Sequence, residues 1–80
     1  MTLTREQCRA ARALLDWSQA DLASAAGTGL STVARFERGD LKTYASTLET
    51  LRTTLETAGI EFIPENGGGP GLRLKKARGQ

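Results

Sequence analysis

The chain has 80 residues, of which 39% are hydrophobic and 25% are charged, and these proportions are those of one small soluble domain. Its single cysteine cannot form an intramolecular disulfide, and the absence of histidine excludes a Cys/His zinc cluster as well as Ser–His and Cys–His catalysis. Composition therefore favours a binding module over an enzyme, and we expect no catalytic residue, no metal and no other cofactor.

The net charge of +2 is unevenly distributed along the chain. Four of the eleven basic residues lie in residues 70–80, which contain no acidic residue, so residues 1–69 carry seven positive and nine negative charges, a net −2. Any argument for nucleic-acid binding must therefore rest on local pattern. Apolar runs stay well short of the roughly 20 residues of a membrane span, and the polar N-terminus has no signal-peptide core. We expect a cytoplasmic protein without a membrane partner.

A capping box opens the first expected helix. Thr4 is placed as its N-cap and Gln7 as the residue reaching back, and apolar residues follow at helical spacing. This pattern predicts a helix over about residues 5–15, with an apolar stripe made of Cys8, Ala11, Leu14 and Leu15. The stripe makes Cys8 a small core residue rather than a reactive one.

Two short helices are expected next, separated by a tight turn. Ser18 and Asp21 form a second capping box, and Gly27 is the natural end of that helix. A third helix is expected over 30–38, with Val33 and Phe36 facing inward and a glycine after its last residue.

The last helix and a hairpin complete the chain. A third capping box, starting at Ser46, is expected to open a helix that ends at Gly59. Alternating residues at 60–63 and 72–75 then predict two strands around a turn-rich segment, whose glycine run lacks the Lys-Ser/Thr of a phosphate loop. We therefore predict a mainly α fold, in which a four-helix domain (1–59) precedes a C-terminal β-hairpin (60–76) and a frayed tail (77–80).

Residues 19–39, with the sequence QADLASAAGTGLSTVARFERG, resemble the helix-turn-helix of the Xre/Cro family of phage-repressor-like regulators. The resemblance rests on Gln19 at the start, Gly27 in the turn and the closing Arg-Phe-Glu-Arg-Gly, and it extends over about residues 3–58 with the flanking helices. It implies a repressor-like fold, double-stranded DNA as the partner and a third helix that enters the major groove.

The resemblance also implies which residues contact DNA. The base-contact candidates lie at the start of the third helix and one turn later; they are Leu30, Ser31 and Arg35. The phosphate-contact candidates are Ser18, Gln19, Thr32, Arg38 and Lys42. Two departures from the family pattern bear on base specificity: Gly29 replaces the usual hydroxyl cap, and Leu30 is apolar. The plainer interpretation of Arg35 is a solvated helix residue that pairs with an acid.

Such regulators bind DNA as symmetric dimers, and an isolated hairpin is marginal in water. We therefore expect the hairpin to complete a homodimer through Ile60, Phe62, Ile63, Leu72 and Leu74. The predicted function is a sequence-specific transcriptional regulator, a repressor on a pseudo-palindromic operator, without an evident small-molecule ligand. The alternative is a protein-interaction module of antitoxin or anti-activator type, which the near-neutral helix-turn-helix and the apolar Leu30 support.

Overall fold

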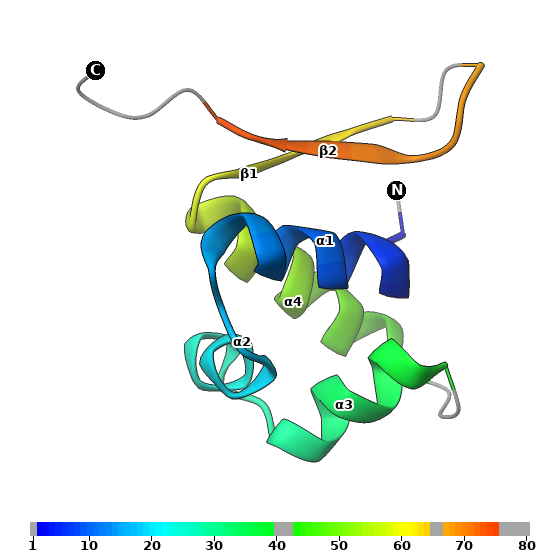
Figure 1. The fold of residues 1–80 in the computed structure, drawn as a ribbon. Coiled ribbons are helices and arrows are strands. Elements are labelled where there is room, and N and C mark those ends of the chain that lie inside the picture. Colours follow the sequence, from blue (N-terminus) through cyan, green and yellow to red (C-terminus); the bar gives the residue numbers. More distant parts are fainter. Residues whose placement is uncertain (1, 40–42, 65–66, 76–80) are drawn as a thin grey trace.

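In the computed structural model, which describes residues 2–39, 43–64 and 67–75, four helices are followed by a two-stranded hairpin (Figure 1). The helices are α1 (Arg5–Leu15), α2 (Gln19–Ala26), α3 (Leu30–Arg38) and α4 (Ala45–Thr57), and the strands are β1 (Ile60–Ile63) and β2 (Gly71–Leu74). The predicted mainly α fold class is confirmed. The expected frayed tail, 77–80, lies outside the described residues.

The first three helices begin and end where the sequence predicts. At α1, the hydroxyl of Thr4 accepts from the backbone N–H of Gln7 and the Gln7 side chain accepts from the backbone N–H of Thr4, both at 3.0 Å. Ser18 and Asp21 make the same reciprocal pair at α2. Because each box satisfies N–H groups that the helix itself leaves free, it fixes where the helix begins.

The capping box expected at Ser46 is wrong. Helix α4 begins at Ala45, and its N-cap is Tyr44, which has extended backbone angles and makes no side-chain cap bond. Ser46 is already helical, and its carbonyl accepts a hydrogen bond from the hydroxyl of Thr50 at 3.0 Å. A hydroxyl caps a helix only from the extended residue at its boundary, and that position belongs to Tyr44.

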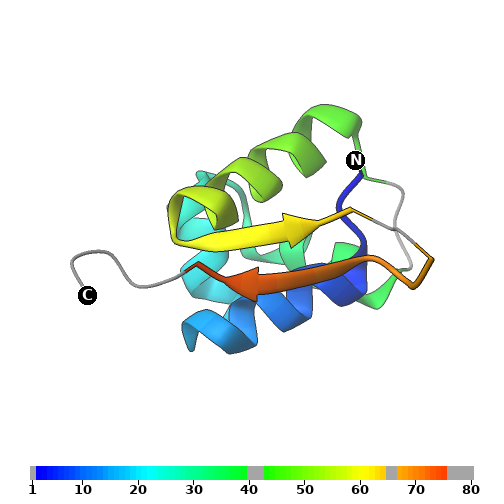
Figure 2. The ribbon, with the colours of Figure 1, turned by 90° about the horizontal axis from the view of Figure 1, so that it is seen from above.

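The hairpin covers α1 and α4 on the side away from α2 and α3 (Figure 1). Seen from above, β1 runs beside α4 and β2 lies over α1 (Figure 2). The strands pair antiparallel, with Ile60 opposite Leu74 and Ile63 opposite Gly71. The second strand therefore begins one residue before the predicted 72–75, because Gly71 still has a partner in β1.

One hydrophobic core joins the helices and the hairpin. Its buried members come from the N-terminal segment, all four helices and β1: Leu3, Cys8, Ala11, Leu22, Ala23, Val33, Leu51, Leu55, Ile60 and Phe62. Leu14, predicted in the stripe of the first helix, is 47% exposed instead. The polar Gln7 of the same helix is buried, and its amide donates to the carbonyl of Gly71 at 3.3 Å. None of the described helices is long and apolar enough to cross a membrane.

Candidate nucleic-acid interface

Helices α2 and α3 are joined by a turn of three residues, 27–29. Gly27 has a left-handed backbone (φ 70°), and the N–H of Thr28 returns to the carbonyl of Ala23 at 3.0 Å. A residue with a side chain rarely adopts this conformation, so glycine allows the chain to leave α2 and start α3 at once. The two helices pack against each other directly.

The two faces of α3 differ sharply. Val33 is fully buried and Glu37 is 3% exposed, so this face is fixed against the rest of the domain. Ser31 and Arg35 are exposed on the other side, and Leu30 is 52% exposed at the first helical residue. The structure therefore leaves all three base-contact candidates exposed, Ser31 and Arg35 on the free face of α3 and Leu30 at its first residue.

The start of α2 places Ser18 and Gln19 beside this helix. The Ser18 oxygen accepts from the N–H of Asp21, which leaves its hydroxyl proton available to a further acceptor such as a phosphate oxygen. The Gln19 amide already donates to the Glu37 carboxylate at 3.1 Å. Gln19 thus links α2 to α3, a role that the sequence pattern did not reveal.

The other phosphate-contact candidates differ in how far they are exposed to solvent. Arg38, the last residue of α3, is exposed, whereas Thr32 is half-buried in its first turn. Lys42 lies outside the described residues. As expected, Gly29 is the N-cap of α3 and provides no side-chain cap bond.

A buried carboxylate holds the helix-turn-helix onto α1. Arg12 reaches Glu37 with two bonds, Nε to Oε2 at 2.8 Å and Nη2 to Oε1 at 2.7 Å. The Cys8 thiol donates to Oε2 at 3.0 Å and the Gln19 amide to Oε1. Side chains from α1 and α2 thus meet on one residue of α3. No local sequence pattern indicated that Arg12 would be the partner of Glu37, because the two residues are 25 positions apart.

The network sets the charge state of its members. Burial opposes ionisation of Glu37, but the hydrogen bonds from Arg12, Cys8 and Gln19 outweigh it, so the pKa of Glu37 lies below its ordinary value. Burial, with the neighbouring Glu37 carboxylate, raises the pKa of the Cys8 thiol far above its ordinary value. The thiol therefore stays protonated at neutral pH and acts as a donor.

The predicted dimerisation residues are placed on two different parts of the hairpin. Ile60 and Phe62 belong to the core of the single chain, so their side chains face inward. Ile63 is 37% exposed, Leu74 is 49% exposed and Leu72 is half-buried. Because Leu72 packs against the core opposite Phe62, Ile63 and Leu74 are the members exposed to a second molecule.

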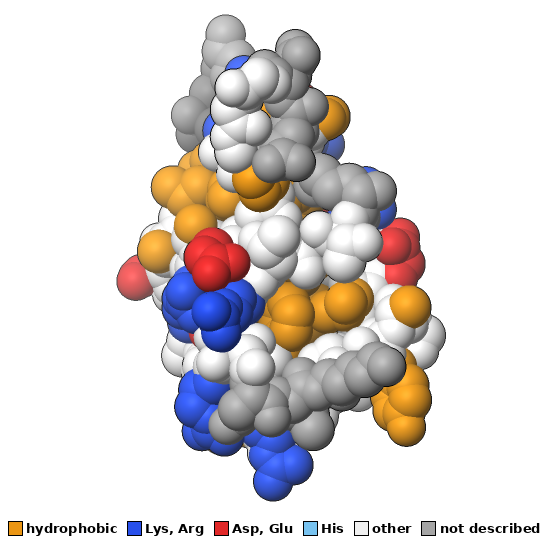
Figure 3. Space-filling view, turned by 90° about the vertical axis from the view of Figure 1, so that its right-hand side faces the viewer, with side chains coloured by type: hydrophobic (Ala, Val, Ile, Leu, Met, Phe, Trp, Pro, Cys, Tyr) orange, Lys and Arg blue, Asp and Glu red, His pale blue; other side chains and the backbone are white. Residues whose placement is uncertain are grey.

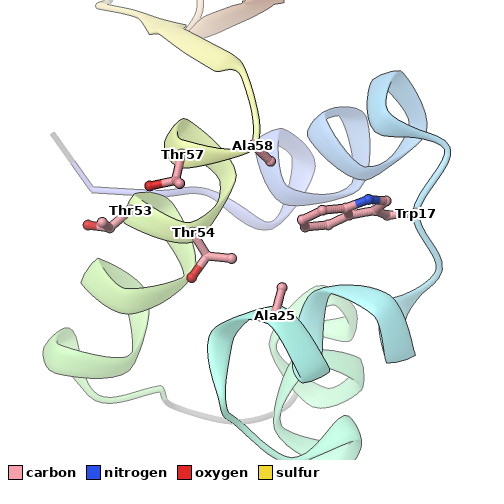
Figure 4. Close-up of a pocket in the computed structure, with 6 residues that line it drawn as sticks. All are labelled: Trp17, Ala25, Thr53, Thr54, Thr57 and Ala58. Atoms are coloured by element: carbon pink, nitrogen blue, oxygen red, sulfur yellow. The ribbon is translucent and has the colours of Figure 1, made fainter.

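A shallow hollow of about 300 Å³ lies between α4 and α2, beside the ring of Trp17 (Figure 4). Its other lining residues carry only methyl and hydroxyl groups: Ala25, Thr53, Thr54, Thr57 and Ala58. No acid or base lines it. Within 2–39, 43–64 and 67–75 there is no group of three or more acidic or cysteine side chains placed to hold a metal ion.

The tight turn between α2 and α3, together with the free face of α3, defines a helix-turn-helix protein. The Xre/Cro-like helix-turn-helix family model, HTH_3, matches residues 9–59, and the chain belongs to this family. The matched segment runs from α1 through the residue that precedes β1, so the hairpin lies beyond it. No curated protein matches the chain. Membership makes it a DNA-binding protein of the transcription-regulator class.

Proposed function

We propose that this protein is a sequence-specific repressor that binds a pseudo-palindromic operator as a homodimer. The observation that carries the proposal is the exposed surface of α3, where Ser31 and Arg35 lie opposite the buried Val33 and Glu37, and Leu30 is exposed at the first residue of the helix. A helix held by one face and bare on the other can enter the major groove without disturbing its own packing. The family match supports DNA over the alternative of a protein-interaction module.

The three side chains suit base edges in different ways. The guanidinium of Arg35 can donate two parallel hydrogen bonds to guanine O6 and N7. Ser31 can donate or accept, and Leu30 offers an apolar contact for a thymine methyl group. Phosphate contacts from Ser18, Arg38 and Lys42 would supply much of the affinity and make it depend on salt.

In a homodimer the two copies of α3 would read successive major grooves about 34–36 Å apart. We place this activity in the cytoplasm, where the DNA is, and we assign the protein no catalytic role. The hollow beside Trp17 is lined by threonine hydroxyls, and none of its lining residues is an acid or base that could activate them.

Fluorescence anisotropy tests the proposal. The wild-type chain is titrated into a labelled duplex from directly upstream of its own gene and into a scrambled duplex of the same length, at two salt concentrations. We expect at least about a thousandfold preference for the upstream duplex and a steep loss of affinity at the higher salt. For an operator elsewhere in the genome, a duplex selected by the protein from a random pool replaces the upstream one.

Equal, weak binding to selected and scrambled duplexes would overturn the proposal. A stable complex with another protein that survives high salt would instead support the interaction module.

A further inference from the structure

Helix α3 is short, and its C-terminal end needs partners from outside the helix. The last four carbonyls of any helix have no partner within it, and in α3 these belong to the residues from Arg35 to Arg38. The N–H of Gly39 reaches the first two, at 3.1 Å from the Arg35 oxygen and 3.0 Å from the Phe36 oxygen. Among the described residues, no backbone N–H bonds the other two carbonyls, those of Glu37 and Arg38.

Arginines of α1 bind both of them. Nη1 of Arg9 donates to the Glu37 carbonyl, and Nη1 of Arg5 donates to the Arg38 carbonyl at 2.9 Å. Positions 5, 9 and 12 lie on one face of α1, so the Arg12 that binds the Glu37 carboxylate continues the same row. We call Arg5 and Arg9 the arginine clamp. Positive charge is also favoured at a helix C-terminus, where the carbonyl dipoles point outward.

The clamp lies directly against the glycine that follows α3. Gly39 has a left-handed backbone (φ 76°), and a Cβ at this position would overlap the Arg5 guanidinium, whose Cζ would lie only 2.9 Å away. Gly27 has a similar φ of 70° but open space around it. The close approach of an arginine is thus particular to the end of α3.

The clamp lies on the side of the molecule where the start of α1 meets the end of α3. Figure 3 looks onto this side and shows basic side chains at the height of α1 and a second group lower down, at the height of α3. Val33 is the only fully buried apolar side chain of α3 within the described structure, and Phe36 packs against the core while staying partly exposed. Hydrogen bonds from the arginines of α1 therefore add to this apolar packing in orienting α3.

From this geometry we propose that Arg5 and Arg9 are positioning residues for DNA recognition. They hold the C-terminal end of α3 against α1 and so fix the direction in which Ser31 and Arg35 meet the bases. The proposal rests on the proposed function for its effect on DNA, whereas the clamp itself is a property of the free protein. A guanidinium that only supplied general positive charge would affect every DNA sequence equally.

The test compares the double variant Arg5→Met/Arg9→Met with the wild type. Methionine keeps an unbranched chain and removes the donors. The probes are a duplex selected by the wild type from a random pool and a scrambled duplex of equal length, both at fixed salt. We expect the affinity ratio between the two duplexes to fall about tenfold, the size of one mismatched base pair. The variant Arg5→Lys/Arg9→Lys, which keeps charge and a donor, should recover part of the ratio.

Arg52→Met is the matched control for lost charge. Arg52 lies on α4 and pairs with Glu49 and Glu56 of its own helix. It should leave the ratio unchanged. A double Met variant that is folded and keeps the wild-type ratio would overturn the positioning role, since a purely structural contribution lowers stability without altering discrimination by the folded protein.

A measurement without DNA separates this inference from the proposed function. Residual dipolar couplings of backbone amides report the orientation of α3 relative to α1 in the free chain. We expect these couplings in α3 to change in Arg5→Met/Arg9→Met and to be largely restored by the Lys variant. Unchanged couplings in the Met variant would overturn the clamp. A wild type that fails to discriminate between duplexes, with couplings that do respond, would overturn the proposed function and leave the clamp standing.

Discussion

Single residues on α3 divide into those that face solvent and those that fix the helix. Arg35 and Glu37 are two positions apart, yet Arg35 is exposed and Glu37 is buried, with only 3% of its surface exposed. Their substitutions should therefore have different consequences, since Arg35 faces away from the core and Glu37 holds three side chains of α1 and α2.

Arg35→Ala should weaken binding to the selected duplex by about 1–3 kcal/mol and relax the preference at one base pair of each half-site, because its paired contact with guanine would be lost. Anisotropy with duplexes changed at one base pair at a time measures both effects. Lys42→Ala serves as the comparison and should weaken all duplexes about equally. Equal losses on selected and random DNA for both variants would show that Arg35 does not read a base.

Arg12→Met should lower the free energy of unfolding by about 3 kcal/mol. It leaves the carboxylate of Glu37 buried, with only the Cys8 thiol and the Gln19 amide as donors. Urea denaturation measures the change. The comparison is Arg73→Met, which removes a solvent-exposed pair with Glu61 and should lower the free energy of unfolding much less. Similar small losses for the two would mean that the buried pair contributes little.

The same network predicts a loss of stability in acid. The pKa of Glu37 is lowered in the folded chain, so folding favours its ionised form. That contribution is complete above the ordinary carboxyl pKa, near 4.5, and is lost as the pH falls through the lower folded value. Free energies of unfolding measured from pH 7 downward should therefore fall below about pH 4.5 in the wild type. The slope should be shallower in Arg12→Met, and parallel curves would contradict this assignment.

At the scale of elements, most helix boundaries were predicted correctly, because each depends on bonds between residues that are close in the sequence. Reciprocal caps at Thr4 and Ser18 and left-handed glycines at Gly27 and Gly39 fix helix ends with atoms a few residues apart. The capping box at Ser46 was misleading because a Ser-x-x-Glu spacing can equally lie inside a helix that begins earlier.

Contacts between elements could not be predicted in this way. The two bonds of the arginine clamp join residues that are 28 and 33 positions apart, and the bond from Gln7 to Gly71 joins residues 64 positions apart. No local pattern encodes which carbonyl such a side chain will reach. The residues of the free α3 face were predicted because a helix buried through Val33 has only one other side. The partners of Glu37 required the packing of three helices.

Alanine substitutions of two glycines at helix ends test the clamp through the free energy of unfolding. Gly27→Ala should cost about 1 kcal/mol, since a left-handed backbone is strained for alanine but the space around it is open. Gly39→Ala should cost about 1 kcal/mol more, because the new methyl group displaces Arg5 from the Arg38 carbonyl. Thermal or urea unfolding measures both.

A double-mutant cycle assigns the extra cost. In the Arg5→Met background, Gly39→Ala should be no more harmful than Gly27→Ala, because the guanidinium is already absent. If the extra cost persisted in that background, its cause would be the backbone at Gly39 and not the close approach of Arg5.

For the whole molecule, the hairpin is the element beyond the family match, and its outer edge has free hydrogen-bonding groups. The N–H of Lys75 donates to the Gly59 carbonyl at 2.7 Å, so these two residues form a hydrogen-bonded pair. In an antiparallel ladder every second pair is hydrogen-bonded, and the next such pair in this register is Glu61 with Arg73. The backbone groups of Leu72 and Leu74 therefore point away from β1, and no described residue pairs with them. Exposed Leu14 and Leu74 add apolar surface on the α1 and β2 side.

This edge predicts how the proposed homodimer forms: β2 of one molecule would pair antiparallel with β2 of the other about a two-fold axis. Leu74→Lys should then shift the protein to monomer, because lysine on an edge strand opposes pairing, while the 49% exposure of Leu74 leaves the core intact. Sedimentation velocity over a concentration series measures the shift. Tyr44→Lys is the control, since Tyr44 is 80% exposed at the start of α4, away from the hairpin.

The dimer also connects the hairpin to DNA. A monomeric Leu74→Lys variant has an unchanged α3, so it should still prefer one half-site over a scrambled sequence. It should lose the additional affinity that a second half-site, about 34–36 Å along the duplex, gives the wild type. Anisotropy with duplexes carrying one or two half-sites measures this difference. A dimer that persists in Leu74→Lys, with its two-site affinity intact, would place the dimer interface elsewhere than the edge of β2.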